Sequence, residues 1–461
     1  MTVTGCSRGG PGFDAQFVPS EVTTSLMPEA QNGLEDHVGV NDIVNERFGT
    51  PQQLKAWTKL PLEFGGTTGT IAESPDGSVA VKVLKLTFDH DVKSFDAATD
   101  DEQVSLQIVS GEAATEVASI LRYSAETGVA DLSGALEKIP AAGDMIVLAG
   151  GDVLKHGRVL YMRHCSHCHG TSGDGAGPTA EYLYPRPRDY RNGLFKFTST
   201  KSLMRPSRDD IARILKNGIP GTYMPSFVPM LEADELHDTV EYVRFLSMRG
   251  EFERKIAGEF SAEYSQAAYD ERRERGESRQ EITDALKAFY VEDLPDYLND
   301  DADALTDGWT AAEEEDSVIV PSVPRVTNDV ESRRRGRELF VGATLNCVNC
   351  HGIGGRGDGP QTRDFELVDG RPRPHAGLHD EWGQLVKPRD LTSGIYRGGR
   401  RPVDIFRRIY SGINGAKMPA FGGKITDEQM WDVVNYVLSI PFEPEPGKGV
   451  IAAPAAETAS L

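Results

Sequence analysis

Two short segments of the chain repeat one arrangement of cysteine and histidine. Residues 165–169 read CSHCH and residues 347–351 read CVNCH, so both follow the pattern C-x-x-C-H. Two thiols at this spacing can add across the vinyl groups of one porphyrin edge, and the adjoining histidine can give the iron its proximal axial nitrogen. The pattern therefore predicts two covalently attached c-type haems.

A single motif of this kind would also suit a zinc half-site or a redox dithiol. A zinc site would require a second ligand pair near each motif. Neither motif has another cysteine pair nearby. Two copies, each followed by the same landmarks, favour haem.

A methionine follows each motif in a second repeated segment. Residues 218–227 read GIPGTYMPSF and residues 412–421 read GINGAKMPAF, so both follow G-I-x-G-x-x-M-P-x-F. A thioether is a soft ligand suited to haem iron, and the proline after it restricts the backbone to extended geometry. Core packing is the usual role of an isolated methionine, but the parallel setting predicts Met224 and Met418 as the second axial ligands.

With these landmarks the chain resembles tandem class I cytochrome c domains, a bacterial, exported, dihaem c-type cytochrome. The resemblance also uses a glycine and an aromatic residue before each haem motif and a tyrosine in a later helix. In that family the first and last helices of a domain cross, with the glycine at the close approach and the aromatic residues packed beside it. The matching residues are Gly157, Tyr161 and Tyr242, and Gly336, Phe340 and Tyr436.

The predicted fold is mainly α, with two helical haem domains, an N-terminal α+β region and a charged helical connector. Strands are expected over 78–88 and 103–109, and helices over 34–48, 207–217, 232–249, 255–290 and 426–439. The predicted divisions are a tether at 1–20, a region of unknown role at 21–149, haem domain 1 at 150–250, an acidic helical connector at 251–330, haem domain 2 at 331–441 and a disordered tail at 442–461.

Two arginines occupy matching Pro-Arg-Asp segments after the haem motifs. Arg188 and Arg389 could each hydrogen-bond a haem propionate as a charge-assisted pair, or lie in a surface turn. An insertion precedes Arg389 and holds His375 and His379, whose i, i+4 spacing would suit a metal on a helix. Nearby prolines and a glycine favour a polar loop instead.

The net charge of −22 is unevenly distributed along the chain. Residues 1–150 hold 22 acidic and 9 basic residues, and residues 251–330 hold 22 and 8. These acidic segments are either solvated surface or a means of steering a basic redox partner or shielding the haem faces. The negative balance disfavours a nucleic-acid partner.

The fifth cysteine, Cys6, lies in a V-T-G-C segment that resembles the end of a bacterial lipoprotein signal. The charged and apolar regions of a signal peptide do not precede it, although haem attachment by the bacterial route occurs outside the cytoplasm. We therefore expect a start that is too late, with lipidation of Cys6 or a stray cysteine as the two alternatives. No run of about 18 apolar residues suggests a membrane helix.

These features predict an electron carrier of the periplasm or the outer membrane face, passing single electrons between respiratory partners such as an oxidase or a quinol-oxidising complex. A peroxidase-like or sulfur-oxidising dihaem enzyme and a cytochrome subunit of a respiratory complex are the alternatives. No catalytic residue is predicted. The predicted haem-binding residues are Cys165, Cys168, His169, Met224, Arg188, Cys347, Cys350, His351, Met418 and Arg389.

Overall fold

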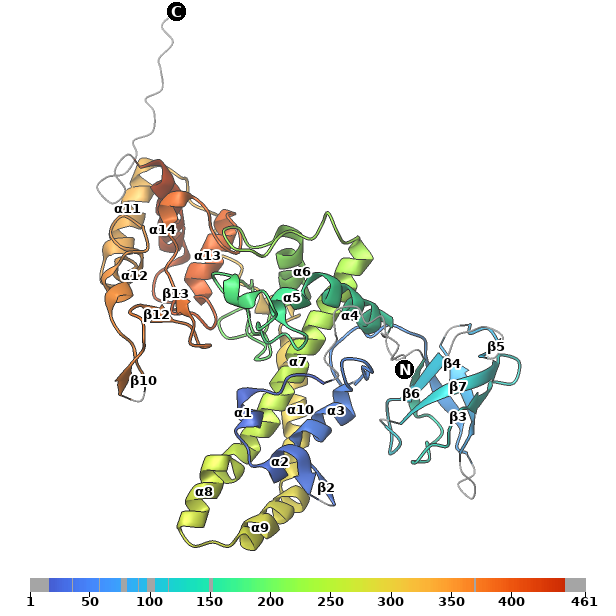
Figure 1. Cartoon of the computed structure of the whole chain (residues 1–461). Helices are drawn as coiled ribbons and strands as arrows, with labels where there is room; N and C mark the ends of the chain where they lie inside the picture. Colours follow the sequence, from blue (N-terminus) through green and yellow to red (C-terminus); the bar gives the residue numbers. More distant parts are fainter. Residues whose placement is uncertain are drawn as a thin grey trace, which may run out of the picture. The chain divides into compact units, whose positions relative to one another are not determined.

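The computed structural model describes residues 16–443, apart from 35, 58, 76–80, 90, 98–103, 115, 149–151 and 369. Contacts within the chain group it into two units (Figure 1). Unit 1 holds the chain up to residue 179, then 190–193 and 233–307, and unit 2 holds 180–189, 194–232 and the chain from 308 onward. Cys6 and residues 444–461 of the predicted tail lie outside the described residues.

Unit 1 contains a closed antiparallel sheet, which forms the strand-rich part of the predicted α+β region. The strands pair in the order β5-β7-β6-β9-β3-β4-β8, and β7 also pairs with β8, which closes the ring. Alternate residues such as Leu84 and Leu86 are buried inside, as a strand with one core-facing side requires. The strands are β3 (Thr68–Glu73), β4 (Val83–Phe88), β5 (Phe95–Asp96), β6 (Val104–Ile108), β7 (Val117–Ser124), β8 (Val129–Leu132) and β9 (Met145–Leu148).

Short helices precede this sheet. The helix expected over 34–48 is shorter than predicted, because a β-hairpin occupies its first part. Gly33 has a φ of 90°, which ends the preceding helix, and Gly39 is extended at the N-cap of the next one. The elements are α1 (Glu21–Thr24), α2 (Pro28–Asn32), β1 (Gly33–Leu34), β2 (His37–Val38) and α3 (Val40–Phe48).

The longest helix of unit 1, α7 (Ala233–Tyr264), continues well beyond residue 249, where the sequence predicted its end. Its apolar side continues through Phe252, Ile256 and Phe260, all fully buried, so packing carries the helix past Gly250. Gly250 itself lies against Arg191, since a Cβ atom there would be 2.4 Å from the arginine Cβ. The helices predicted over 255–290 correspond to the end of α7, α8 (Gln266–Glu274) and α9 (Arg279–Glu292). A further helix, α10 (Leu294–Ala311), follows them.

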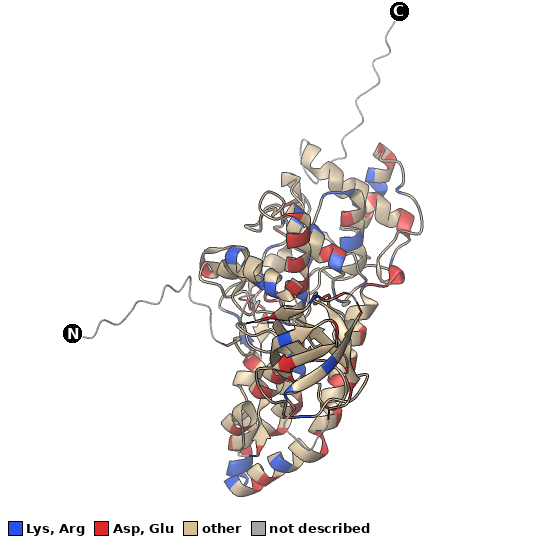
Figure 2. Ribbon diagram, turned by 90° about the vertical axis from the view of Figure 1, so that its right-hand side faces the viewer, with Lys and Arg blue, Asp and Glu red and all other residues tan. Residues whose placement is uncertain are grey.

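Both signs of charge occur along the helices (Figure 2), and acidic residues outnumber basic ones over 251–330. Lys255 pairs with Asp301 at 3.1 Å, and a capping box of Ser278 and Glu281 begins α9. No helix among the described residues is both long enough and apolar enough to cross a membrane.

Unit 2 is built around the crossing of α11 and α14 and a core that includes Phe340, Phe406, Trp431 and Tyr436. Two predicted helices are confirmed as α6, capped by Ser207 and Gly218, and α14, capped by Thr426. The helices are α6 (Arg208–Asn217), α11 (Val330–Val341), α12 (Val348–His351), α13 (Pro402–Ser411) and α14 (Asp427–Ser439), and the short strands are β10 (Leu367–Val368), β11 (Arg371–Pro372), β12 (Leu378–His379) and β13 (Leu385–Val386).

Candidate haem sites

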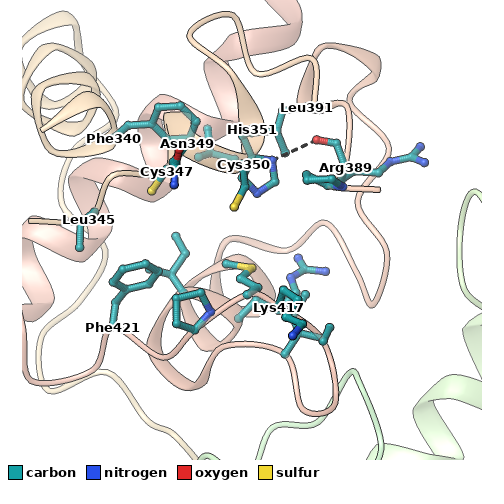
Figure 3. A pocket seen from close by; sticks show the side chains of 18 of the residues that line it. Phe340, Leu345, Cys347, Asn349, Cys350, His351, Arg389, Leu391, Lys417 and Phe421 are labelled. Carbon is teal, nitrogen blue, oxygen red and sulfur yellow. Dashed lines mark hydrogen bonds between the residues drawn. The ribbon is translucent and has the colours of Figure 1, made fainter. Parts of the chain in front are cut away.

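The second C-x-x-C-H motif forms one helical turn in unit 2. The amide of His351 donates to the carbonyl of Cys347 at 2.8 Å, and α12 ends at Gly352, whose φ is 74°. This turn brings the side chains of Cys347, Cys350 and His351 to one side of a cavity (Figure 3). Burial raises the pKa of the Cys347 thiol to about 12.

The cavity has a volume of about 530 Å³. Cys347, Cys350 and His351 line one side, and the labelled side chains of Lys417 and Phe421 lie across from them (Figure 3). Met418 also lines it. A space of this size with mainly apolar walls and a few placed polar groups suits a large planar cofactor, so these residues fit a haem.

The orientation of His351 follows from its hydrogen bond. Its Nδ1 lies 3.1 Å from the carbonyl oxygen of Arg389. A carbonyl can only accept, so Nδ1 carries the hydrogen and Nε2 keeps its lone pair. Burial lowers the pKa of His351, which keeps the imidazole neutral. A neutral imidazole with Nε2 available is the form that binds iron.

The loop that carries Met418 follows α13 and begins at Gly412, which has a φ of 72°. The amide of Ile413 donates to the carbonyl of Met418 at 3.0 Å, and the amide of Phe421 donates to the carbonyl of Ile409 at 3.0 Å. A Cβ atom on Gly412 would be 2.6 Å from the oxygen of Met418, so only glycine fits. These bonds fix the loop around the methionine.

The loop of Met224, also in unit 2, has the same backbone pattern. Gly218 has a φ of 64°, and its Cβ position is likewise 2.6 Å from the methionine carbonyl oxygen. The amide of Ile219 donates to the carbonyl of Met224 at 3.0 Å, and that of Phe227 to the carbonyl of Leu215 at 2.9 Å. The repeated sequence thus produces a repeated conformation.

The first C-x-x-C-H motif lies in unit 1, at the end of α4 (Asp152–His164) and in α5 (Ser166–His169). The amide of His169 donates to the carbonyl of Cys165 at 2.9 Å. The His169 ring is 5.5 Å from that of Tyr190, whose hydroxyl is 2.5 Å from that of Tyr161. Burial raises the pKa of the Cys165 thiol to about 12, as it does for Cys347. This turn brings Cys165, Cys168 and His169 close together. The turn of the second motif does the same for Cys347, Cys350 and His351.

The helix crossing implied by the family resemblance occurs in both units. In unit 1, α4 crosses α7, and the rings of Tyr161 and Tyr242 are 5.3 Å apart. In unit 2, α11 crosses α14, and the rings of Phe340 and Tyr436 are 5.4 Å apart. The same pair of helices therefore frames each haem motif.

The predicted site residues divide between the units. Unit 2 brings Cys347, Cys350, His351, Met418 and Arg389 around one cavity. Unit 1 holds the first motif, while Met224 and Arg188 belong to unit 2. The guanidinium of Arg188 lies 3.5 Å from the centre of the Trp382 ring, and burial lowers its pKa to about 10.

The insertion before Arg389 does not form a metal-binding helix. His379 lies in β12, buried, with Nδ1 3.3 Å from a carboxylate oxygen of Glu366, which also pairs with Lys417 at 3.2 Å. Among the described residues, no cluster of histidine, cysteine and carboxylate side chains could hold a metal ion. Sequence reasoning noted this insertion but missed Trp382, and a lone tryptophan in a proline- and glycine-rich segment was the available signal.

Two family models match the chain. The model for cytochrome c matches residues 334–441, and the model for cytochrome c oxidase, cbb3-type, subunit III matches residues 152–243. Two cytochrome c-type domains are therefore present, and domains of this kind imply covalently bound haem c. The residues matched by the two family models do not include the closed sheet or helices α8–α10.

A curated relative and a solved structure are similar to parts of the chain. The cbb3-type cytochrome c oxidase subunit FixP of Sinorhizobium medicae is 32% identical over 114 residues, which are 23% of this chain and 33% of the relative. The match thus spans about a third of that relative's length. A chain of the reducing HAO-like protein complex of Kuenenia stuttgartiensis is 23% identical, with a TM-score of 0.43, over 62% of this chain and 96% of that one.

Proposed function

We propose that this protein is a dihaem c-type cytochrome that transfers single electrons between respiratory redox partners. One haem would be attached to Cys165 and Cys168 and ligated by His169 and Met224. The other would be attached to Cys347 and Cys350, with His351 and Met418 as its ligands. The two cytochrome c-type domains support haem-based electron transfer in general, and the number of haems and their ligands are our inference.

The cavity of unit 2 is the observation that carries this proposal. It collects two thiols, a histidine with Nε2 available and a methionine in a fixed loop, in the apolar surroundings that a haem needs. Haem iron supplies the reversible one-electron change when it is bound. His351 and Met418 would hold the two axial positions of that haem, and the carbonyl of Arg389 orients the imidazole.

The methionine loops support an electron carrier over an enzyme. An enzyme needs an iron with an open or exchangeable position, whereas two fixed axial ligands suit electron transfer. The shared loop conformation therefore favours a carrier at both sites. Rapid binding of carbon monoxide to the native ferrous protein would instead support a peroxidase-like or sulfur-oxidising enzyme.

Replacement of each methionine tests the ligand assignment. We expect Met224→Ala and Met418→Ala each to remove the sulfur-to-iron charge-transfer band of one ferric haem and to lower the potential of that haem, because methionine ligation raises it. Absorption spectra and a redox titration measure both effects. Met230→Ala, outside both loops and exposed, is a matched control. Unchanged spectra in both ligand variants would refute the assignment.

The partner we propose is a respiratory oxidase or a quinol-oxidising complex. The similarity of part of the chain to an oxidase subunit supports an oxidase in particular, including a stable place within such a complex. The acidic residues of 251–330 would serve as a docking surface for a basic partner. Co-purification from membranes at low and high salt would separate a stable subunit from a free carrier.

We place the protein in the periplasm or on the outer face of the cytoplasmic membrane, since bacterial haem attachment occurs there. Lipidation of Cys6 would anchor it. Mass spectrometry of the mature N-terminus tests this, and an unmodified Cys6 would refute the anchor. The divisions 1–20, 21–149, 150–250, 251–330, 331–441 and 442–461 remain our proposal for the domain organisation, although residue 250 lies inside α7.

A further inference from the structure

Arg188 and Arg389 occupy equivalent sequence positions, and both lie beside a methionine loop in unit 2. The loop beside each arginine belongs to the other cytochrome c-type domain. Arg389 lies against Gly221, and Arg188 lies beside Gly415. Each glycine is the third residue before a predicted axial methionine. The two contacts are therefore reciprocal.

Arg389 is held by its own segment and packs on the loop of Met224. Its Nε donates to the carbonyl of Ile395 at 2.7 Å, and Nη2 is 3.4 Å from the hydroxyl of Ser393. A Cβ atom on Gly221 would be 3.0 Å from Nη2 and 3.1 Å from Nη1. The flat guanidinium thus lies directly on the glycine, whose φ of 75° itself favours that residue.

Arg188 contacts the loop of Met418 together with Trp382. The guanidinium stacks on the tryptophan ring at 3.5 Å. A Cβ atom on Gly415 would be 2.3 Å from that ring and 3.4 Å from Nη1 of Arg188. The amide of Glu381 also donates to the carbonyl of Gly415 at 3.2 Å. Trp382 of the insertion therefore packs between Arg188 and the loop of Met418.

Further bonds join the same segments. The amide of Leu203 donates to the side-chain oxygen of Asn414 at 3.2 Å, next to Gly415. Lys196 pairs with Asp380 at 3.1 Å, and Asp380 is nearly buried at 7% side-chain exposure. Removal of Lys196 would leave the nearly buried carboxylate of Asp380 without this partner. The segments of the two domains are thus fixed to each other within unit 2.

From these contacts we infer that Arg188 and Arg389 are exchanged positioning residues. Arg389 of the second domain holds the loop of Met224, and Arg188 of the first domain, through Trp382, holds the loop of Met418. This inference rests on the proposed methionine ligation. It differs from the expectation that each arginine either bonds a haem propionate or lies in a surface turn. Ligation of one iron then depends on an arginine from the other domain, which couples the two haems.

The test uses variants that keep a single methionine ligand. In the Met418→Ala protein the charge-transfer band belongs to Met224 alone, and in the Met224→Ala protein it belongs to Met418 alone. Arg389→Gln and Arg188→Gln are introduced into both. The measurement is the imidazole concentration that displaces the remaining methionine, read from the loss of the band in the ferric protein.

We expect a crossed result. Arg389→Gln should lower the displacing concentration about 2- to 30-fold where Met224 remains, the size expected for a coupling residue without ligand contact. Where Met418 remains the change should be smaller, because Arg389 also lines the cavity of the second motif. Arg188→Gln and Trp382→Leu should do the reverse. A change confined to the methionine of the arginine's own domain would overturn the inference and favour the propionate role. Equal changes at both methionines, or none, would also overturn it.

Haem content and circular dichroism establish that each variant is folded and loaded. Where a glutamine variant loses haem, Arg389→Lys or Arg188→Lys carries the test, because lysine keeps the charge but lacks the planar group that stacks on glycine or tryptophan. We expect the lysine variants to show the same crossed pattern with a smaller change. If neither parent with one methionine shows a charge-transfer band, the proposed ligation is wrong, and this inference falls with it.

Discussion

The helix crossings of the two units use one contact geometry with different polar partners. In unit 1 a Cβ atom on Gly157 would be 2.1 Å from the backbone oxygen of Asp238. The side chain of the same aspartate lies 2.8 Å from Nδ1 of His156, one residue before the glycine. Nδ1 of a second histidine, His237, lies 3.2 Å from a carboxylate oxygen of Asp238. In this crossing the carboxylate of Asp238 therefore lies beside two histidine side chains.

In unit 2 the corresponding distance from Gly336 to the backbone oxygen of Asp432 is 2.0 Å. The carboxylate of Asp432 accepts hydrogen bonds from Arg335 at 2.7 Å and from Ser332 at 2.6 Å. Arg335 also directly precedes the glycine, but its charge is permanent. The comparison teaches that the glycine and the aromatic pair set the approach of the helices, while the polar residue before the glycine can be histidine or arginine.

Of the changes that test the two domains separately, loss of either cysteine pair should have the largest effect, which is the loss of one haem. We expect Cys165→Ala with Cys168→Ala to leave one haem per chain, and Cys347→Ala with Cys350→Ala to leave the other, because each pair forms its own helical turn. Haem content and the mass of haem-bearing peptides measure this. Loss of both haems in one variant would contradict the independence of the two sites.

Substitution of the crossing glycines should be the next largest effect. Gly157→Ala and Gly336→Ala place a methyl group on a backbone oxygen of the facing helix, so we expect each to lower the free energy of unfolding by about 1–3 kcal/mol. Chemical unfolding measures the change. Gly258→Ala in α7 is the control, since no heavy atom lies within 4 Å of its Cβ position, and it should be neutral or stabilising. A tolerated alanine at either crossing would show that the approach is looser there.

The methionine loops allow a finer comparison. Gly415→Ala meets the rigid Trp382 ring, whereas Gly221→Ala meets the end of the flexible Arg389 side chain, so Gly415→Ala should weaken methionine ligation more. Both also introduce backbone strain of about 1–2 kcal/mol. Gly423→Ala has a similar φ but an open Cβ position, which separates strain from crowding. Imidazole displacement of the methionine measures the difference, and equal effects at both glycines would remove the asymmetry.

The smallest effect should be a pH dependence of the helix crossing in unit 1, where His237 contacts the carboxylate of Asp238. Burial lowers the pKa of His237, but its bonds to Asp238 and Glu63 outweigh this, so the pKa is raised overall. The stabilisation is then complete below the unfolded pKa of about 6.5 and is lost as the pH rises through the folded pKa. The stability difference between the parent and His237→Gln should shrink over this range in urea unfolding. A constant difference would show that the proton has no part.

The sequence predicted the local elements well, and the reason is that their signals are local. The caps Ser207 and Thr426 mark α6 and α14, and the repeated methionine segments produce matching loops. Glycine with positive φ at 218 and 412 explains that match, since the loop cannot form with a side chain there. The ligand roles of Met224 and Met418 remain predictions.

What the sequence could not predict depends on contacts between distant segments. The closure of the sheet through β7 and β8 and the stacking of Arg188 on Trp382 leave no local periodicity. The end of α7 was misplaced because its continuation depends on tertiary packing of Phe252 and Phe260 rather than on a stop signal. The propionate roles expected for Arg188 and Arg389 remain predictions.

The uninterrupted path of α7 through residue 250 has a practical consequence for dissecting the protein. Glu253 accepts hydrogen bonds from the amide of Ser20 at 2.5 Å, from the hydroxyl of Thr23 at 2.8 Å and from Arg249 at 3.1 Å, with its side chain 1% exposed. A fragment ending at residue 250 would lack Glu253, so the buried guanidinium of Arg249 would lose this carboxylate partner. It would also lose the hydrogen bonds that Ser20 and Thr23 donate to Glu253. Modular expression of the first haem domain therefore has to retain the helix through Tyr264.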